Sequence, residues 1–160
     1  MSEKEENSNF WETDSAISWA VVRLTQLSSD VVSLTQIQQL SPASLAYLGD
    51  AVYELYVRTC YLLPPKRLKD YHQQVVAQVR AETQAATLQS LTPYLTDNEL
   101  EILRRGRNAA TGSPRRLAPE IYQQATSLET LLGYLYLTDP HRLTQLLAHL
   151  KPDTQEKVIN

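Results

Sequence analysis

The sequence predicts an all-α protein with a single domain, and three observations lead to this prediction. The chain has 160 residues, an ordinary length for one domain, and its 42% hydrophobic and 21% charged residues are typical of a globular protein. Only four Gly and one Phe stand among many Leu, Ala and Gln residues. Apolar residues recur at helical spacing, and no segment shows the alternation of a β-strand.

The N-terminal part is the least regular part of the chain. Its first residues, MSEKEENSNFWETDS, are polar and acidic, which is unlike a secretory signal and typical of disorder. A short helix is expected over 16–27, followed by mixed loop and helix over 28–40. The predicted organisation is therefore a disordered acidic tail over 1–14, an N-terminal extension over 15–40, a helical domain over 41–150 and a C-terminal tail over 151–160.

Two long helices are predicted first in the domain. Ser41-Pro42 begins one of them, because Ser is a good N-cap and Pro fits the first helical position. Pro64-Pro65 ends this helix. The next helix is expected to run without interruption over 66–91, until Thr92-Pro93 breaks it. The tyrosines near the first of these helices (Tyr47, Tyr53, Tyr56 and Tyr61) are interpreted as core and interface residues rather than platforms for stacked bases.

Three more segments complete the predicted domain. Thr96 and Glu99 form a capping box that begins a helix ending near Arg105. The Gly, Asn, Ser and Pro residues of 106–118 predict a loop. A long helix is then expected over 119–137. Asp139-Pro140 begins the last helix, which ends near residue 150.

The charge of the chain is unevenly distributed. The net charge is -3, yet residues 1–16 hold five acids against one Lys, whereas residues 58–116 hold ten Lys or Arg against five acids. The middle of the chain could therefore contact phosphates despite the overall acidity. A single Cys, Cys60, excludes an internal disulfide, and no apolar run is long enough for a membrane span. A cytoplasmic protein without membrane attachment is expected.

Two carboxylates occupy unusual positions. Asp50 follows Gly49 in the apolar run LAYLGDAVYELYVR, and Glu129 lies in a similar run, SLETLLGYLYL. A carboxylate in apolar surroundings needs a metal, a cation or a proton to compensate its charge. The pair suggests a shared metal site, although Glu129 could also be a solvated residue on an amphipathic helix. Glu54, four residues after Asp50, could simply pair with Arg58 on the surface.

The available ligands favour Mg²⁺ over zinc. Mg²⁺ commonly takes one or two protein carboxylates and completes its shell with water and substrate phosphates. The three His residues and Cys60 lack the spacing of a zinc site, and no P-loop or nucleophile elbow is present. A hydrolase of this type would use water activated by the metal.

Basic residues cluster in two places and predict contacts to phosphate. Arg binds phosphate oxygens in a bidentate manner and keeps its charge, although either cluster could also be an ordinary solvated face. The candidates for phosphate contact are Lys66, Arg67 and Lys69 at the start of the second helix, and Arg104, Arg105, Arg107, Asn108, Arg115 and Arg116 around the predicted loop.

These motifs together resemble the ribonuclease III family. LAYLGDAVYELYVR is similar to its signature helix with a Leu-Gly-Asp core, and ATSLETLLGYLYL is similar to its second acidic helix. Between them, RRGRNAATGSPRR resembles the Arg-Gly-Arg-Asn-Ala segment of the Mini-ribonuclease III group. The three segments occur in the matching order over about 40–150. As in that group, no double-stranded-RNA-binding domain is expected.

The resemblance implies a specific enzyme. It implies a dimeric, all-α endonuclease domain of ribonuclease III type that uses Mg²⁺ to cleave double-stranded RNA, leaving 5′-phosphate and 3′-hydroxyl ends. The expected process is maturation of 23S ribosomal RNA precursor ends, in which a ribosomal protein could assist. RNA would be recognised through its A-form shape and phosphates.

The resemblance also implies roles for individual residues. Asp50 and Glu129 match two metal-binding acids of the family, whereas Ala46 and Thr126 occupy the positions of the other two. Asp50 and Glu129 are therefore the expected catalytic and metal-binding residues. Glu54 and Thr126 are candidates for contact with groups bound to the metal.

Two other interpretations remain at this point. The replacement of two acids by Ala46 and Thr126 would also suit a non-catalytic RNA-binding or ribosome-assembly protein on the same fold. A helical dimerisation module without an RNA role would explain the apolar helices, but it would explain neither Asp50 nor the Arg-rich segment.

Overall fold

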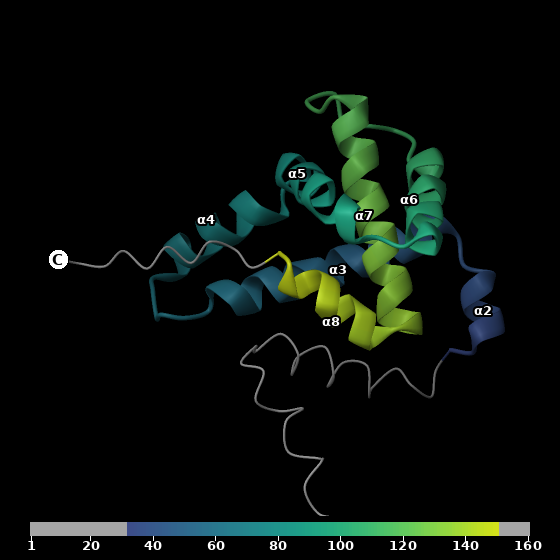
Figure 1. The fold of residues 1–160 in the computed structure, drawn as a ribbon. Helices are drawn as coiled ribbons and strands as arrows, with labels where there is room; N and C mark the ends of the chain where they lie inside the picture. Colours follow the sequence, from purple (N-terminus) through teal and green to yellow (C-terminus); the bar gives the residue numbers. More distant parts are fainter. Residues whose placement is uncertain (1–31, 151–160) are drawn as a thin grey trace, which may run out of the picture.

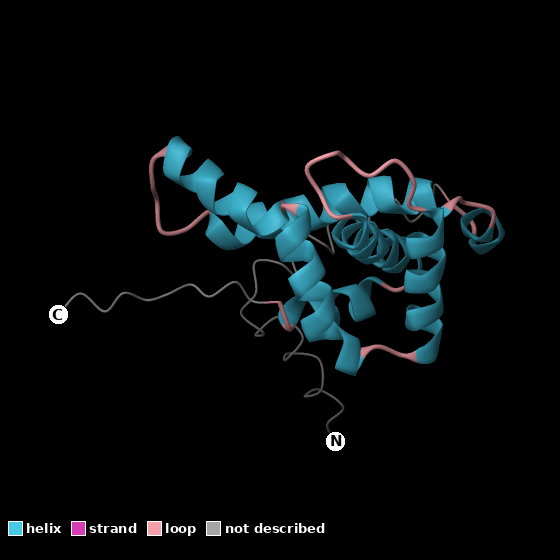
Figure 2. Cartoon of the chain, turned by 90° about the horizontal axis from the view of Figure 1, so that it is seen from above, coloured by secondary structure: helices cyan, strands magenta, loops and turns pink. Residues whose placement is uncertain are grey.

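A computed structural model describes residues 32–150, and every regular element within this range is a helix (Figure 2). The prediction of an all-α protein is therefore confirmed. The predicted tails and the helix expected over 16–27 lie outside the described residues. No helix within the described range is long and apolar enough to cross a membrane. The helices are α2 (Leu34–Gln38), α3 (Pro42–Tyr61), α4 (Leu68–Val79), α5 (Ala81–Leu91), α6 (Asp97–Ala109), α7 (Pro119–Thr138) and α8 (Pro140–Ala148), with a 3₁₀ turn at Thr92–Tyr94.

Helices α3 and α7 cross at the centre of the domain, and the other helices pack around them (Figure 1). Helices α5 and α6 lie against α7, whereas α4 packs on α3. The core between them is aliphatic, and its largest fully buried side chains come mainly from α7 and α8. Burial of this apolar surface is the main stabilising contribution to the fold. The fully buried leucines are Leu91, Leu128, Leu131, Leu132, Leu143, Leu146 and Leu147.

Glycines set the closeness of the α3–α7 crossing. A Cβ built on Gly49 of α3 would lie 2.6 Å from the carbonyl carbon of Glu129 and closer still to its oxygen. A Cβ on Gly133 of α7 would lie 2.9 Å from the carbonyl carbon of Leu45. Real Cβ atoms do not approach backbone this closely, so only Gly permits the contact at either position.

The second predicted helix is in fact two helices. The chain leaves the helical conformation at Arg80, where ψ is 153°, so that α4 ends at Val79 and α5 begins at Ala81. Neither Gly nor Pro marks this break, and sequence reasoning therefore predicted one continuous helix over 66–91. Packing between helices accounts for the break, because α4 packs against α3 whereas α5 packs against α7.

Helix α6 is also longer than predicted. The capping box of Thr96 and Glu99 is present at its start, but the helix continues to Ala109 instead of ending near Arg105. Gly106 was expected to open a loop. Instead it is buried within α6, and a Cβ there would lie 2.5 Å from Oγ1 of Thr130 on α7. Its role is close helix packing rather than turn formation.

The tyrosines of α3 occupy different environments. Tyr53 and Tyr56 are buried in the core, as predicted, and the Tyr56 hydroxyl donates to the carbonyl of Leu147 at 2.8 Å. Tyr47, by contrast, is 86% exposed, so it does not belong to the core of this chain.

Candidate active site

A pocket of about 300 Å³ opens between α3, α6 and α7, and it contains both carboxylates singled out from the sequence. Asp50 comes from α3 and Glu129 from α7, and the close glycine crossing brings their two helices together. The rest of the wall is made mainly of small residues, which leave room beside the acids. The lining residues are Ala43, Ala46, Tyr47, Asp50, Gly106, Ala109, Ala110, Thr111, Tyr122, Thr126 and Glu129.

Both carboxylates have pKa values above the usual range. Burial, followed by the negative charge of Asp50, raises the pKa of Glu129 to about 7. Partial burial, followed by the charge of Glu54, also raises the pKa of Asp50 above its usual range. Two acids that share a site in this way disfavour simultaneous ionisation unless a cation is present. The arrangement therefore attracts either a proton or a metal ion.

Gln84 of α5 also belongs to this site, and sequence reasoning missed it. Its side chain is 2% exposed, and its interaction with Glu129 opposes the rise in the pKa of that carboxyl. The amide nitrogen Nε2 also donates to the carbonyl of Val79 at 2.8 Å. No sequence signal pointed to Gln84, because it comes into place through the unpredicted break between α4 and α5.

Ala46 and Thr126 line the same pocket as the two acids. Ala46 lies one turn before Asp50 on α3, and Thr126 lies one turn before Glu129 on α7. The site thus has two carboxylates where the resemblance would place four. Among the described residues, no group of three or more His, Cys, Asp and Glu is placed to hold a metal.

Glu54 follows the simpler of its two interpretations. Nε of Arg58 donates to its Oε1 at 3.0 Å, one turn along α3, which makes the surface ion pair that the spacing suggested. Glu54 does not line the pocket, but its negative charge contributes to the raised pKa of Asp50.

The Arg-Gly-Arg-Asn-Ala segment forms the last turns of α6 and borders the pocket. Gly106 and Ala109 lie on the pocket wall, whereas Arg105, Arg107 and Asn108 are exposed. Arg104 is exposed but engaged, because two of its nitrogens donate to Glu101 at 2.8 and 2.6 Å. These residues were predicted to surround a loop, and the structure places them on a helix.

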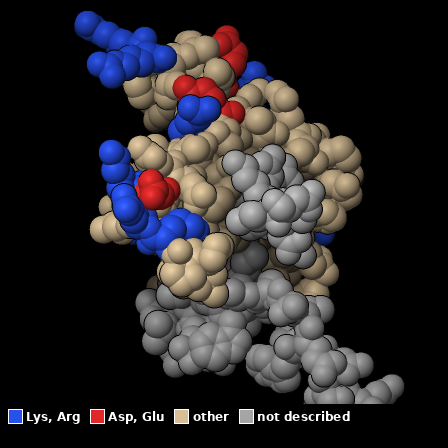
Figure 3. Space-filling model, turned by 90° about the vertical axis from the view of Figure 1, so that its left-hand side faces the viewer, with Lys and Arg blue, Asp and Glu red and all other residues tan. Residues whose placement is uncertain are grey.

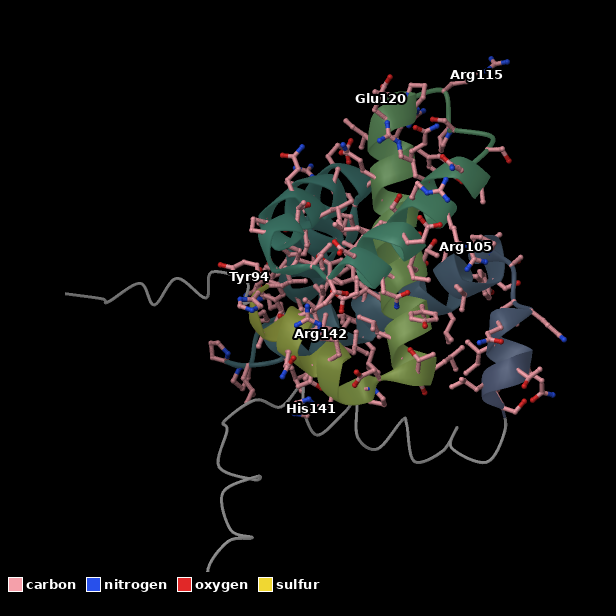
Figure 4. The ribbon with its side chains drawn as sticks, turned by 45° about the vertical axis from the view of Figure 1, so that its right-hand side comes forward. Tyr94, Arg105, Arg115, Glu120, His141 and Arg142 are labelled. Atoms are coloured by element: carbon pink, nitrogen blue, oxygen red, sulfur yellow. The ribbon has the colours of Figure 1, made fainter. Side chains whose placement is uncertain are left out.

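The other basic candidates lie on two projecting parts of the domain. Arg115 and Arg116 are exposed in the segment before α7, and the side chain of Arg115 extends away from the domain at its tip (Figure 4). Arg67 and Lys69 are exposed at the start of α4, whereas Nζ of Lys66 donates to the carbonyl of Tyr61. Figure 3 shows Lys and Arg side chains gathered into separate groups along one edge of the surface.

Three comparisons relate this chain to known proteins. The sequence profile of the ribonuclease III domain matches residues 43–140. Mini-ribonuclease 3 from Synechocystis sp. is 60% identical over 131 residues, which are 81% of this chain and 92% of that protein. Mini-ribonuclease 3 from Synechococcus sp. is 64% identical over 113 residues, or 71% of this chain and 82% of that protein. The crystal structure of a Fusobacterium nucleatum protein superposes with a TM-score of 0.64 at 28% identity, over 69% of this chain and 91% of that one.

Proposed function

The chain belongs to the ribonuclease III domain family, in its Mini-ribonuclease 3 group, and from this membership we propose that it cleaves double-stranded RNA at the pocket of Asp50 and Glu129. It is an endoribonuclease. The observation that carries the assignment of the site is the pairing of these two acids, from separate helices, in one pocket bordered by the Arg-rich end of α6. The proposed substrate is the 23S ribosomal RNA precursor in the cytoplasm, with 5′-phosphate and 3′-hydroxyl ends on the products.

The donor set suits a hard divalent cation such as Mg²⁺. Both acids offer carboxylate oxygens, and the pKa of Glu129 is raised to about 7 by burial and then by the negative charge of Asp50, both of which a bound cation would offset. Asp50 and Glu129 would hold the ion. When bound, it would supply a Lewis acid for the scissile phosphate and lower the pKa of a coordinated water.

The chain's own residues prepare the site for this chemistry. Glu129 must release its proton before it can bind a cation, so its carboxylate becomes available near neutral pH. The small side chains of Ala46 and Ala109 leave space beside the two acids for the phosphate backbone. Because only two carboxylates are present, binding of the cation in the absence of RNA is expected to be weak, and RNA phosphates complete its coordination.

RNA binding is assigned to exposed residues, most of them basic, that lie near the pocket and at the start of α4. Arg105, Arg107 and Asn108 follow the pocket wall along α6, and Arg115 and Arg116 extend beyond it. Arg67 and Lys69 add positive charge at the start of α4. Such contacts position the RNA backbone without reading its sequence, and they make binding sensitive to salt. A ribosomal protein bound to the precursor could supply further affinity.

The proposed enzyme is a homodimer that pairs through α3. The support comes from Tyr47, a large aromatic side chain of α3 that lines the pocket and is 86% exposed. An aromatic side chain this exposed is a typical interface anchor. Gel filtration of Tyr47→Ala tests the pairing, because loss of the dimer is expected, whereas a wild-type monomer at micromolar concentration would contradict it.

A second function is favoured by one specific observation. Ala46 and Thr126 replace two acids, and this replacement would also suit a protein that binds RNA without cutting it. Cleavage assays separate the two. Double-stranded RNA is incubated with the wild type, Asp50→Asn and Glu129→Gln, with and without Mg²⁺.

The proposed site predicts cleavage only by the wild type and only with Mg²⁺. Glu120→Gln is the matched control, because Glu120 is an exposed acid in the first turn of the same helix as Glu129 (Figure 4). Cleavage that survives both substitutions would refute the site. Binding of RNA without cleavage by the wild type would support the non-catalytic alternative.

A further inference from the structure

A buried amide lies behind the two acids. The side chain of Gln84 is 2% exposed, does not line the pocket, and contacts Glu129 from the side of α5. Buried amides usually have all their polar atoms paired. In the described part of the chain, Oε1 of Gln84 is the one buried side-chain atom without a hydrogen-bond partner.

The orientation of this amide is determined by its neighbours. Nε2 donates to the carbonyl oxygen of Val79 at 2.8 Å, and the side chain also faces the carboxylate of Glu129, whose pKa it lowers. Both neighbours are acceptors, so a rotated amide would turn its oxygen toward two other oxygens. The amide nitrogen therefore faces Glu129 and Val79, and Oε1 faces away from them.

The break between α4 and α5 creates the anchor for this arrangement. Val79 is the last residue of α4, where a helix leaves its carbonyl oxygens without partners in the helix itself. The side chain of Gln84 donates a hydrogen bond to this carbonyl oxygen. Because α5 packs along α7, the amide of Gln84 also lies near Glu129. A role limited to capping α4 would need only one N–H. It would explain neither the interaction with Glu129 nor the unpaired oxygen.

We propose that Gln84 is a positioning residue of the metal centre: its amide nitrogen holds the carboxylate of Glu129 in place for the cation, and its Oε1, on the side away from Glu129, accepts a hydrogen bond from a buried water. This proposal rests on the proposed function of Asp50 and Glu129. A buried acceptor left unpaired is destabilising, and a buried water with several polar partners commonly satisfies such a group. Residues that orient metal ligands in this way influence affinity for the metal without binding it themselves.

The test compares Gln84→Met with Gln89→Met in the full-length protein. Met keeps the length of the Gln side chain and favours a helix, but it can neither hold Glu129 nor accept from water. Gln89 is an exposed residue of the same helix, so its variant carries the same chemical change away from the site. Binding of Mn²⁺ without RNA is measured by electron paramagnetic resonance of the free ion, and RNA affinity is measured without metal.

The expected result for Gln84→Met is a Mn²⁺ dissociation constant raised about 10-fold. The Mg²⁺ concentration for half-maximal cleavage is expected to rise by a similar factor, while RNA affinity without metal stays unchanged. A merely structural defect would lower the melting temperature and RNA affinity together. If Gln84→Met does not fold, Gln84→Ala replaces it, because Ala favours the helix and makes no new contact.

Wild-type affinity for Mn²⁺ in a folded Gln84 variant would overturn the inference. Asp50→Asn separates this failure from failure of the proposed function. If Asp50→Asn weakens Mn²⁺ binding but the Gln84 variants do not, only the role of Gln84 is wrong; if Asp50→Asn has no effect either, the metal site itself is wrong. A crystal structure of the Mg²⁺-bound protein should show a water within hydrogen-bond distance of Oε1, and direct pairing of Oε1 with protein would contradict this part of the proposal.

Discussion

Gly49 and Glu129 lie in backbone contact, so that a Cβ on the glycine would fall 2.6 Å from the carbonyl carbon of the acid. This contact places Asp50, the next residue of α3, in the same pocket as the side chain of Glu129. The glycine before the acid is therefore part of the architecture of the site. Its helix-weakening effect is the cost of bringing two acidic helices together.

Substitution of Gly49 by Ala should destabilise the protein. Ala improves helix propensity by about 1 kcal/mol, but its Cβ would overlap backbone atoms of Glu129, which cannot move aside as a side chain would. We expect a lower melting temperature and loss of cleavage. Gly106→Ala should lower the melting temperature less, because the atoms nearest to its new Cβ belong to the side chain of Thr130 rather than to backbone. Thermal unfolding of both variants checks this order, and the reverse order would contradict the crossing described here.

The stability of the metal-free protein should depend on Glu129. Its pKa is raised to about 7 when folded, compared with an ordinary value of 4.5, so the folded protein binds the extra proton between these two pH values. Stability from this group is therefore lost as the pH rises from about 4.5 through 7. Glu129→Gln should be more stable than the wild type at pH 8, on the order of 1 kcal/mol after allowance for solvent screening, and no more stable at pH 4.

Chemical denaturation in EDTA at the two pH values measures this difference. If Glu129→Gln gains no stability at pH 8, the pKa of the Glu129 carboxyl is not raised in the folded state. Addition of Mg²⁺ at pH 8 should stabilise the wild type but not Glu129→Gln, because the cation binds the folded state through this carboxylate.

The ion pair of Glu99 and Arg142 should matter more than surface pairs. Glu99 is buried in α6, and Nε of Arg142 in α8 donates to its Oε1 at 2.6 Å, while Nη2 donates to the Tyr94 carbonyl at 2.7 Å (Figure 4). Arg142→Met would leave a buried carboxylate without its cation, and we expect a loss of about 3 kcal/mol at pH 7. Arg58→Met, which breaks the exposed pair with Glu54, should have little effect.

The ion pair of Glu99 and Arg142 also predicts how the stability of the protein changes at acid pH. The hydrogen bond from Arg142 lowers the pKa of Glu99 below its ordinary value of 4.5. Its contribution to stability is complete above pH 4.5 and declines as the pH falls through the lowered pKa. The difference between Arg142→Met and the wild type in free energy of unfolding should therefore shrink in acid. A difference that stays constant would contradict the pairing.

The basic residues should differ in their contribution to RNA binding. Arg107→Ala should weaken binding to double-stranded RNA and reduce the slope of log affinity against log salt by about 1, because one phosphate contact is lost. Arg104→Ala should have a smaller effect, since Arg104 already donates twice to Glu101. Fluorescence anisotropy at several salt concentrations checks the order. Arg58→Ala is the control, because it also removes one exposed positive charge, and Arg58 pairs with Glu54 and is not a candidate for RNA contact.

Local signals in the sequence predicted most of the helices. Ser41-Pro42, the capping box of Thr96 and Glu99, and Asp139-Pro140 all begin helices in the structure, because caps and Pro act on the residues next to them. The break at Arg80 had no such signal. It depends on α4 and α5 packing against different helices, which neighbouring residues do not encode.

The sequence by itself determined the helical class of this protein, the two unusual acids and the family to which they belong. The spacing of apolar residues and the composition around Asp50 and Glu129 are local properties of the chain, which is why they could be read without a structure. Tertiary structure alone decided that the glycines of both helices let the acids share a pocket. It also decided that Gln84 reaches Glu129 through a helix break, because contacts between distant segments depend on how whole helices pack.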